Sequence, residues 1–291
     1  MQTRSAVSSP QVKLSSPDKV LWPAARFTKG QVLDYYSRVA PAMLPHLAGR
    51  PLTLGRFPNG VEERGFAQVE CRGRPDWLGT AAIRLRNGQV RNFCLARDRA
   101  SLLWIANLCA LELHVFLGLA GSLNQPTAVL FDLDPVPPAT LGEAAQVAVL
   151  LRERLAAGRL SAVVKTTGGA GLHVLVPLNS SHEYGQTRSF ARRIADELAD
   201  KHERVTASST PHQLRSGQVL IDWAQNSERR TFVAPYSMRA DDAPMASTPV
   251  SWTEVERGDC DLRFGPDEVL DRLERLGDLF EPAITSVQRI G

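Results

Sequence analysis

The feature that most constrains this 291-residue chain is a short apolar segment that ends in two aspartates, AVLFDLDP at residues 128–135. Its apolar, β-prone start predicts a buried strand, and Pro135 places the acids near the strand end because proline cannot donate to a ladder. Alternate side chains of a strand share a face, so Asp132 and Asp134 should point the same way. Two carboxylates this close repel each other unless a cation joins them. Oxygen ligands suit Mg²⁺ or Mn²⁺, so the segment predicts a divalent-metal site.

A third aspartate stands in a similar setting. Asp222 ends the apolar segment VLID at 219–222, which also predicts a strand. Three such carboxylates can bridge two metals and support in-line displacement at phosphorus. Other interpretations stay open, because the first two acids can instead cap a turn before Pro135 or form the acid pair of a glycosyltransferase. A haloacid-dehalogenase-type phosphatase is disfavoured, since that family has a hydroxyl residue where this chain has Val136.

A glycine-rich segment, VVKTTGGAGLHV at 163–174, predicts a strand, a flexible turn and a returning strand. Glycines such as Gly168 and Gly169 permit the positive φ and close backbone approach of a phosphate-binding nest. Thr167 can donate its hydroxyl to a phosphate, and His173 begins the returning strand on the same side. This is not a Walker P-loop, since no GK[ST] follows. An ordinary hairpin and a buried core histidine are the alternative interpretations.

Composition sets broad limits. The hydrophobic content of 43% suffices for a sizeable core in one large domain or two small ones, and the net charge of +3 is only mildly basic. Arginines gather at 84–99 and 229–239, where a solvated face is the simplest interpretation. The cysteines at 71, 94, 109 and 260 are widely spaced and contain no CxxC pair, so we expect neither a zinc site nor a disulfide framework, as in a reducing cytoplasm. No apolar run is long enough to span a bilayer, which favours a soluble intracellular protein without a membrane partner.

Predicted helices alternate with hairpin-like pairs of strands, which favours an α+β fold over a doubly wound sheet. Thr28 and Gln31 predict a capping box before a helix that Pro41 should end or kink. Further helices are expected over 102–116, after the capping box of Thr140 and Glu143, over 190–198, and from Pro266. Strands are expected at 128–134, 161–165, 172–178, 219–223 and 231–234. We expect a flexible tail over 1–15 and a single domain over 16–291.

Together these motifs resemble one family. FDLDP at 131–135, GGAGLH at 168–173 and DWAQN at 222–226 are similar to the three motifs of archaeo-eukaryotic primase-polymerases. The similarity is closest to the polymerase domain of bacterial end-joining ligase D and its stand-alone relatives. Further matches, in family order, are PDKVLWP at 17–23, GRP at 49–51, RFPNG at 56–60, LELH at 111–114 and APYSMR at 234–239. The resemblance covers about residues 15 to 280 and leaves no room in these 291 residues for a ligase or nuclease domain.

The resemblance implies a catalytic core of central β-sheets flanked by helices, which adds nucleotides, preferably ribonucleotides, to DNA ends bearing a 5′-phosphate. It implies Mn²⁺ or Mg²⁺ as cofactor, nucleoside triphosphates and DNA gaps or overhangs as partners, Ku and a separate ligase as further partners, and a cytoplasmic, nucleoid-associated location. The acids Asp132, Asp134 and Asp222 match the catalytic metal ligands. Eight residues of this chain match the family's nucleotide-binding positions: His114, Thr167, Gly168, Gly169, His173, Arg215, Gln225 and Arg239. DNA-binding positions match Ser16, Lys19, Lys29, Arg56 and Phe66.

Several positions depart from the family pattern. Ala170 replaces a lysine expected near the triphosphate, Ser16 replaces an asparagine, and Gly55 replaces a pocket lysine. The second aromatic after Phe66 is Ala67, and the following lysine and histidine positions hold Val69 and Glu70. These departures predict weaker nucleotide affinity, with Lys165, Arg229 or Arg230 as compensating cations. They leave two alternatives open, a DNA-end-binding module without catalysis and a primase that works on single strands. For the DNA pocket, ordinary surface lysines and a core Phe66 are the simplest alternative.

Overall fold

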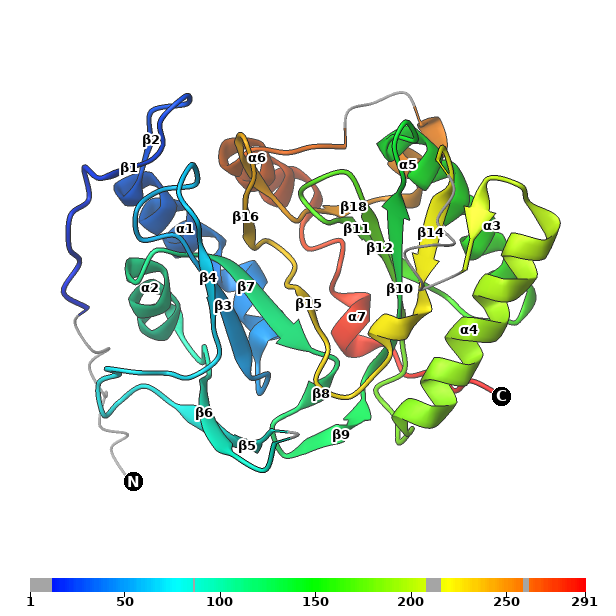
Figure 1. Ribbon diagram of the computed structural model, residues 1–291, viewed down its shortest axis with the longest axis horizontal. Coiled ribbons are helices and arrows are strands. Elements are labelled where there is room, and N and C mark those ends of the chain that lie inside the picture. Colours follow the sequence, from blue (N-terminus) through cyan, green and yellow to red (C-terminus); the bar gives the residue numbers. More distant parts are fainter. Residues whose placement is uncertain (1–11, 86, 208–215, 259–261) are drawn as a thin grey trace, which may run out of the picture.

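Two β-sheets stand side by side in the computed structural model, which describes residues 12–85, 87–207, 216–258 and 262–291 (Figure 1). The first sheet has the strand order β13-β14-β10-β12-β11-β18, and every pairing except the parallel β13–β14 pair is antiparallel. Its strands are β10 (Ala128–Pro135), β11 (Val163–Thr166), β12 (Leu172–Pro177), β13 (Val205–Thr206), β14 (Val219–Asp222) and β18 (Pro249–Val250). The predicted strands at 128–134, 161–165, 172–178 and 219–223 are therefore confirmed to within a few residues.

Helix α7 (Pro282–Thr285) contacts β12, and three further helices cover the other face of this sheet. They are α3 (Leu141–Ala157) and α4 (Tyr184–Lys201), with α5 (Trp252–Arg257) packed against α3 (Figure 1). Val129, Phe131 and Leu133 of β10 are fully buried in the core beneath them. Because side chains alternate along a strand, the residues between them point to the opposite face. The opposite face, which carries Asp132 and Asp134, is left free of these helices.

The second sheet has the order β15-β7-β3-β6-β5, with β4 paired to β3. Its strands are β3 (Leu52–Arg56), β4 (Phe66–Gln68), β5 (Thr80–Arg84), β6 (Val90–Cys94), β7 (Ala110–Phe116) and β15 (Thr231–Val233), of which the sequence predicted only β15. Helices α1 (Lys29–Leu47) and α2 (Arg99–Asn107) pack against each other beside it. The remaining elements are β1 (Val20–Trp22), β2 (Phe27–Thr28), β8 (Gly118–Leu119), β9 (Ser122–Pro126), the 3₁₀ turn η2 (Trp223–Gln225), β16 (Met238–Ala240), β17 (Pro244–Ala246), α6 (Pro266–Leu276) and α7 (Pro282–Thr285). The α+β class is confirmed.

The predicted helix over 102–116 is wrong beyond its first turns. Helix α2 ends at Asn107, Cys109 has a φ of 56°, and β7 starts at Ala110. Strand β7 lies between β3 and β15, and its apolar Leu111, Leu113 and Val115 alternate with half-buried Glu112 and His114. Leu113 and Phe116 continued the helical spacing of α2 by coincidence, and this spacing hid the strand alternation.

Both predicted capping boxes are present, but Pro41 does not end its helix. Thr28 caps α1 and Thr140 caps α3, each with the partner expected. Helix α1 continues through Pro41 and Pro45 to Leu47. Each proline removes one backbone hydrogen bond, and the buried face of the helix outweighs that cost.

The expectation of isolated cysteines is wrong for two of the four. Cys71 and Cys94 form a disulfide, with Cα atoms 5.0 Å apart. The backbone N–H of Cys71 donates to the carbonyl of Asn92, which brings the chain after β4 alongside β6. Wide spacing in sequence says nothing about such tertiary proximity, so the argument for a reducing compartment loses its basis. Cys109 is buried and unpaired, and Cys260 lies outside the described residues.

Ordered contacts begin before residue 16, the predicted start of the domain. The side chain of Asn107, at the end of α2, donates to the carbonyl of Lys13 at 3.2 Å and accepts from the backbone N–H of Ser15 at 3.1 Å. These two residues are therefore attached to the domain. Residues 1–11 lie outside the described ranges. Within those ranges, no helix combines the length and apolar character that crossing a membrane would need.

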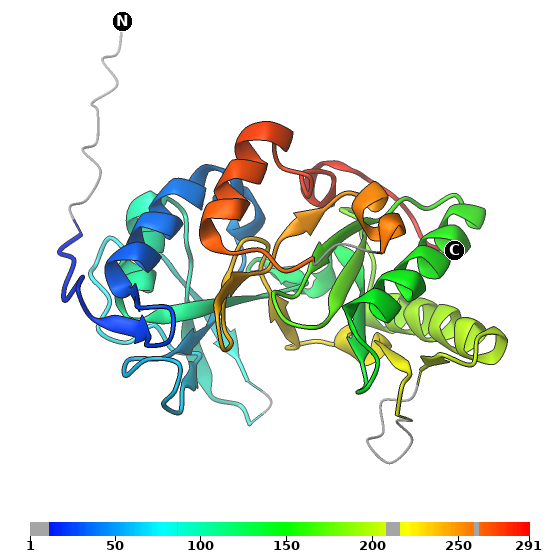
Figure 2. The same ribbon diagram turned by 90° about the horizontal axis from the view of Figure 1, so that it is seen from above.

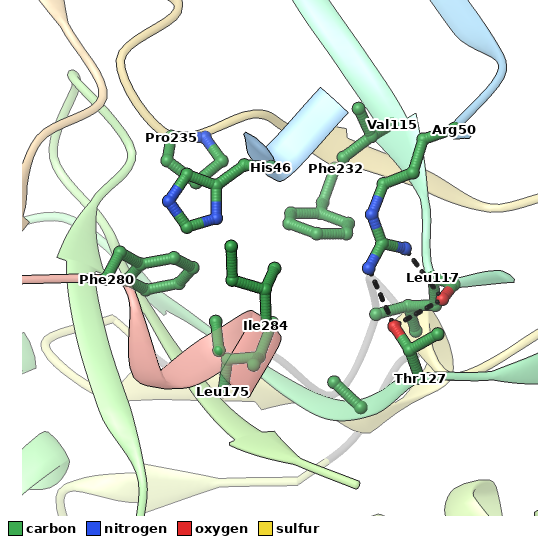
Figure 3. A pocket seen from close by; sticks show the side chains of 12 residues that line it. His46, Arg50, Val115, Leu117, Thr127, Leu175, Phe232, Pro235, Phe280 and Ile284 are labelled. Atoms are coloured by element: carbon green, nitrogen blue, oxygen red, sulfur yellow. Dashed lines mark hydrogen bonds between the residues drawn. The ribbon is translucent and has the colours of Figure 1, made fainter. Parts of the chain in front are cut away.

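Between the two sheets, mostly apolar residues line a small pocket (Figure 3). Arg50, at the end of α1, donates to the carbonyls of Phe116 and Leu117 and to the hydroxyl of Thr127. Phe280 and Ile284, from the C-terminal segment, close the other side (Figure 3). The arginine thus binds the carbonyls where the chain passes from the second sheet toward the first. We assign this pocket to the packing of the two sheets.

The contact between α5 and α6 gives a pH-dependent prediction. Arg272 donates to Glu254, with NH2 3.0 Å from Oε2. Burial alone would raise the pKa of Glu254, but hydrogen bonds from Arg272 and Ser251 bring it from 4.5 to about 2. A pKa depressed by folding stabilises the protein above the unfolded value and loses that contribution as the pH falls toward the folded value. We expect Glu254→Gln to cost about 1–2 kcal/mol at neutral pH, after allowing for partial exposure, and almost nothing near pH 2. Urea unfolding at both pH values checks this, and an equal cost at both would contradict it.

Candidate functional site

Four side chains form a row across the free face of the first sheet. In the strand register, Lys165 of β11 lies opposite His173 of β12, His173 opposite Asp132 of β10, and Asp132 opposite Asp222 of β14. Directly opposed residues of antiparallel strands share a face, with Cβ atoms about 4.5–5.5 Å apart. Asp134 lies two residues beyond Asp132 and so belongs to the same face. The pairing of β10 with β14 thus brings together the three aspartates that the sequence singled out.

Asp132 is the most buried of the three, at 9% exposed. His173 Nε2 lies 3.1 Å from its Oδ1, and Gln225 Nε2 donates to its Oδ2 at 3.3 Å. Burial alone would raise the pKa of Asp132, but the attraction of His173 and Lys165 brings it below its usual value. Asp132 is therefore held as a carboxylate within the row.

The other two acids have the opposite tendency. Burial, and then repulsion from Asp132 and Asp222, raise the pKa of Asp134 to about 7. Burial also raises the pKa of Asp222, and Asp132 adds to the rise, although the backbone N–H of Ala224 donates to Asp222 Oδ1 at 2.9 Å. The Asp134 side chain stays exposed to solvent, so water screens part of this repulsion. A divalent cation would relieve it directly.

The three aspartates suit a hard divalent cation, because their ligand atoms are carboxylate oxygens and their side chains share one face of the sheet. Asp132 Oδ1 is buried and has no hydrogen-bond donor in suitable alignment among the described residues. As the side chains stand, however, no three Asp, Glu, His or Cys residues in the described part of the chain are gathered closely enough to hold an ion. Asp132 is turned toward His173, and binding a metal would need side-chain rotation there. The acids are therefore candidate ligands on one face, not a preformed cage.

The glycine-rich hairpin between β11 and β12 lies directly against these acids. Gly168 has a φ of +84°, and a Cβ there would come within 2.5 Å of the Arg239 side chain. A Cβ on Gly171 would come within 2.7 Å of the Leu133 carbonyl and 3.3 Å of Asp134 Oδ1. Both positions therefore need glycine, for backbone conformation at the first and for close approach at both. The hairpin thus borders Asp134 at Gly171 and Arg239 at Gly168.

Thr167 fills part of the predicted phosphate nest itself. Its Oγ1 accepts from the backbone N–H groups of Gly169 and Gly171, at 3.4 and 3.2 Å, and donates to the Gly171 carbonyl at 3.1 Å. These two N–H groups are thus already satisfied within the turn. A phosphate bound there would have to take the place of the threonine hydroxyl.

Two of the predicted nucleotide-binding residues contact Asp132, and a third cannot be placed. His173 is 3% exposed, contacts Asp132 and packs edge-on against the Phe232 ring. Gln225 also contacts Asp132. Both are therefore placed to orient this candidate metal ligand. Arg215 lies outside the described residues.

Sequence reasoning missed two charged residues at this site. Lys165 was considered only as a replacement for the absent lysine of the hairpin, yet it is fully buried, and its Nζ donates to Ser247 Oγ at 2.6 Å. Glu112 contacts both His114 and Arg239. The available signals were a single lysine within an apolar strand and a glutamate two residues before His114, on the same strand face.

A basic cluster lies near the start of the described chain. Lys29 is only 4% exposed, and its Nζ donates to the carbonyl of Ser15 at 2.8 Å. Burial lowers the pKa of Lys29, and the positive charges of Lys19 and Arg56 lower it further. Lys29 is therefore not an ordinary surface lysine. Ser16 adjoins this cluster, its carbonyl accepting from the Lys19 N–H.

Phe66, predicted to stack on a template base, is 48% exposed, which rules out a core role. The Arg56 guanidinium lies over its ring, 5.3 Å from the centroid, and donates to the Leu108 carbonyl and the Gln68 amide. An exposed aromatic ring with an arginine over it offers a stacking surface beside the basic cluster.

Comparison with known proteins decides the family. The LigD primase-polymerase domain family matches residues 28–280. The chain belongs to this family. It is 37% identical to the multifunctional non-homologous end joining protein LigD of Mycolicibacterium smegmatis over 276 residues. These aligned residues make up 94% of this chain and 36% of the relative. The bifunctional LigD of Bacillus subtilis is 27% identical, over 92% of this chain and 43% of its own length.

The LigD primase-polymerase fold is also seen in a solved structure, the polymerase domain of Mycobacterium tuberculosis ligase D in complex with DNA. It superposes with a TM-score of 0.88 at 33% sequence identity, and covers 96% of this chain and 99% of that one. The chain thus spans about a third of the M. smegmatis LigD protein but nearly all of the solved polymerase domain. The predicted family, fold class and assignment to the polymerase-type nucleotidyltransferases are confirmed.

Proposed function

We propose that this LigD-type domain is a divalent-metal-dependent nucleotidyl transferase that adds nucleotides to DNA ends or gaps in end-joining repair. The observation that carries the proposal is the register of β10 and β14, which sets Asp132 opposite Asp222 with Asp134 on the same face. When bound, Mn²⁺ or Mg²⁺ would activate a primer 3′-hydroxyl and neutralise the triphosphate. Asp132, Asp134 and Asp222 would hold the ions.

The surroundings of the acids suggest how the two substrates lie. The hairpin borders Asp134 at Gly171 and the Arg239 side chain at Gly168. We assign the triphosphate to this side, since a guanidinium suits phosphate oxygens, and the hairpin N–H groups would bind phosphate in place of the Thr167 hydroxyl. Arg188 and Arg230 act on Asp222, at one end of the row, each lowering its pKa. We assign the phosphates of the primer strand to that end.

His173, Lys165 and Gln225 are positioning residues in this proposal. They surround Asp132 and hold its carboxylate ionised. His114, Thr167, Gly169 and Arg239 are the proposed nucleotide contacts, with ribonucleotides preferred over deoxyribonucleotides. Ku and a separate DNA ligase are proposed partners at the break, in a cytoplasmic, nucleoid-associated setting.

Primer extension on gapped DNA tests the function. The wild-type domain should extend a primer across a gap with Mn²⁺ or Mg²⁺, using ribonucleotides more efficiently than deoxyribonucleotides. Incubation with EDTA in place of the metal should stop extension. A domain that binds the gapped DNA but extends no primer under any of these conditions would instead be a DNA-end-binding module.

The basic cluster gives a prediction about DNA ends. A 5′-phosphate is a compact dianion that the exposed Lys19 can bind by charge-assisted hydrogen bonds, while the buried charge of Lys29 adds attraction from behind Ser15. We expect tighter binding to gapped DNA that carries the 5′-phosphate than to DNA that lacks it, by about tenfold. Lys19→Ala should remove most of this preference without loss of stability, because Lys19 is exposed. Fluorescence anisotropy on the paired DNAs measures it.

The matched control for Lys19 is Lys13→Ala, which removes an exposed lysine from the same segment. It should keep the preference for the 5′-phosphate. Equal binding of both DNAs by the wild type would contradict the pocket, and would favour a primase that works on single strands.

A further inference from the structure

Glu112 of β7 connects two of the proposed nucleotide contacts. His114 Nε2 lies 3.0 Å from its Oε2, and Arg239 Nε lies 3.5 Å from its Oε1. The backbone N–H of Ala240 donates to Oε1 at 3.1 Å. The Glu112 side chain is only 16% exposed. A largely buried carboxylate thus joins one side chain of its own strand to one from β16.

The carboxylate fastens β16 to β7 through the Ala240 N–H, but other contacts hold the same segment. The Leu113 N–H donates to Ser237 Oγ at 2.8 Å, and the Ala234 N–H donates to the Leu113 carbonyl at 2.8 Å. Met238 is tied to α1 by a hydrogen bond from its N–H to the Tyr36 hydroxyl. These contacts hold residues 234–238 independently of Glu112. Besides the backbone bond to Ala240, Glu112 sets the direction of two side chains that can carry positive charge.

The second sheet leaves room for this glutamate. Gly55 of β3 lies opposite Glu112, and a Cβ there would come within 2.9 Å of Glu112 Cβ and 3.3 Å of its Oε2. A larger residue at position 55 would have to displace the glutamate side chain. The glycine at position 55, where the family resemblance implied a lysine, is therefore matched to the placement of Glu112.

The Arg239 side chain runs between the glycine-rich hairpin and Glu112. Its Nε faces Oε1, while its Cγ lies 2.5 Å from where a Gly168 Cβ would be. Holding an arginine through Nε leaves its two terminal NH₂ groups free for bidentate contact with phosphate oxygens. In the same way, engagement of His114 through Nε2 leaves Nδ1 for a ligand.

We infer that Glu112 is a positioning residue for the incoming nucleoside triphosphate, which aims Arg239 and His114 into the nucleotide pocket. This inference rests on the proposed function. Without the carboxylate, both side chains regain rotamer freedom, and the nucleotide must order them on binding. The loss should therefore fall on nucleotide affinity and leave DNA affinity intact.

The test measures nucleotide KM, kcat and DNA affinity for Glu112→Ala and Glu112→Gln. We expect Glu112→Ala to raise the nucleotide KM by about 10- to 100-fold, with unchanged DNA affinity. Glu112→Gln keeps the shape and one oxygen acceptor, so its KM should lie between those of the wild type and the alanine variant. If Glu112→Ala does not fold, Glu112→Gln decides. Glu197→Gln is the control, because Glu197 of α4 is also a carboxylate paired with two cations, Arg154 and Lys201.

A double-mutant comparison separates positioning from a general structural role. If Glu112 acts through the two side chains, Glu112→Ala should change the nucleotide KM little in a His114→Ala/Arg239→Ala background. The inference would be overturned if Glu112→Ala raised the nucleotide KM as much in that background as in the wild type. It would also be overturned if Glu112→Ala alone left the nucleotide KM unchanged, or weakened DNA binding as much as nucleotide binding. A wild-type domain without extension activity would refute the proposed function instead. In that case, equilibrium binding of a nucleoside triphosphate with Mn²⁺ still compares wild type and variants, and equal affinities would overturn the inference.

Discussion

Replacing Asp134 with asparagine is expected to reduce nucleotide addition by about 10³-fold or more while the domain stays folded. Asp134 lies on the face of Asp132 and Asp222, next to the hairpin assigned to the triphosphate. The substitution keeps the shape of the side chain but removes the charge that would hold a divalent ion. Single-turnover primer extension measures the loss, and Asp242→Asn, at an exposed acid outside the row, is the control.

The same variant distinguishes lost chemistry from lost structure. Folding raises the pKa of Asp134 from 3.8 to about 7. A raised pKa contributes stability that is complete below the unfolded value and is lost as the pH rises through the folded value. The metal-free wild type should therefore become slightly less stable as the pH rises toward 7, and Asp134→Asn should not. The variant should also lose the increase in Tm that Mn²⁺ gives the wild type. Full activity in the variant would exclude Asp134 from the catalytic site.

The second large effect concerns Ala170, which stands where the resembling family has a lysine. Ala170 is exposed at the tip of the hairpin. Its neighbour Gly171 lies beside Asp134, because a Cβ on Gly171 would be 3.3 Å from Asp134 Oδ1. A lysine there would add one charge-assisted contact to the triphosphate, worth roughly 1.5–3 kcal/mol. We expect Ala170→Lys to lower the nucleotide KM by about ten- to a hundredfold. Steady-state extension at varied nucleotide concentration measures it.

The control for this gain of affinity is Ala170→Gln, which has a long polar side chain without the charge. It should leave the nucleotide KM close to that of the wild type. An unchanged KM in Ala170→Lys would show that another cation already serves the triphosphate. Arg239 is the candidate, since its side chain reaches the same hairpin. Asp241, whose Oδ2 lies 3.7 Å from where a Gly169 Cβ would be, could also capture the new lysine.

The sequence predicted the first sheet well and the second poorly. Strands β10, β11, β12 and β14 are short apolar segments bounded by Gly, Pro or Asp, and local pattern identifies such strands. Strand β7 follows α2 after two residues, and Leu113 and Phe116 continue the helical spacing of α2, so the segment fitted a helix as well as a strand. The disulfide between Cys71 and Cys94 depends on pairing across the second sheet, and that pairing was not predicted.

By itself, the sequence determined the chemistry of the candidate site. The residue types at 132, 134 and 222, their alternation along apolar strands and the glycines of the hairpin were legible because strand periodicity and backbone freedom are local properties. Tertiary structure alone decided which groups meet. The register of antiparallel strands set His173 and Lys165 in line with Asp132, and the packing of β16 on β7 placed Glu112 between His114 and Arg239. These contacts join residues up to 127 positions apart, as between Glu112 and Arg239, and no local pattern encodes which distant charges will be neighbours once the two sheets are packed.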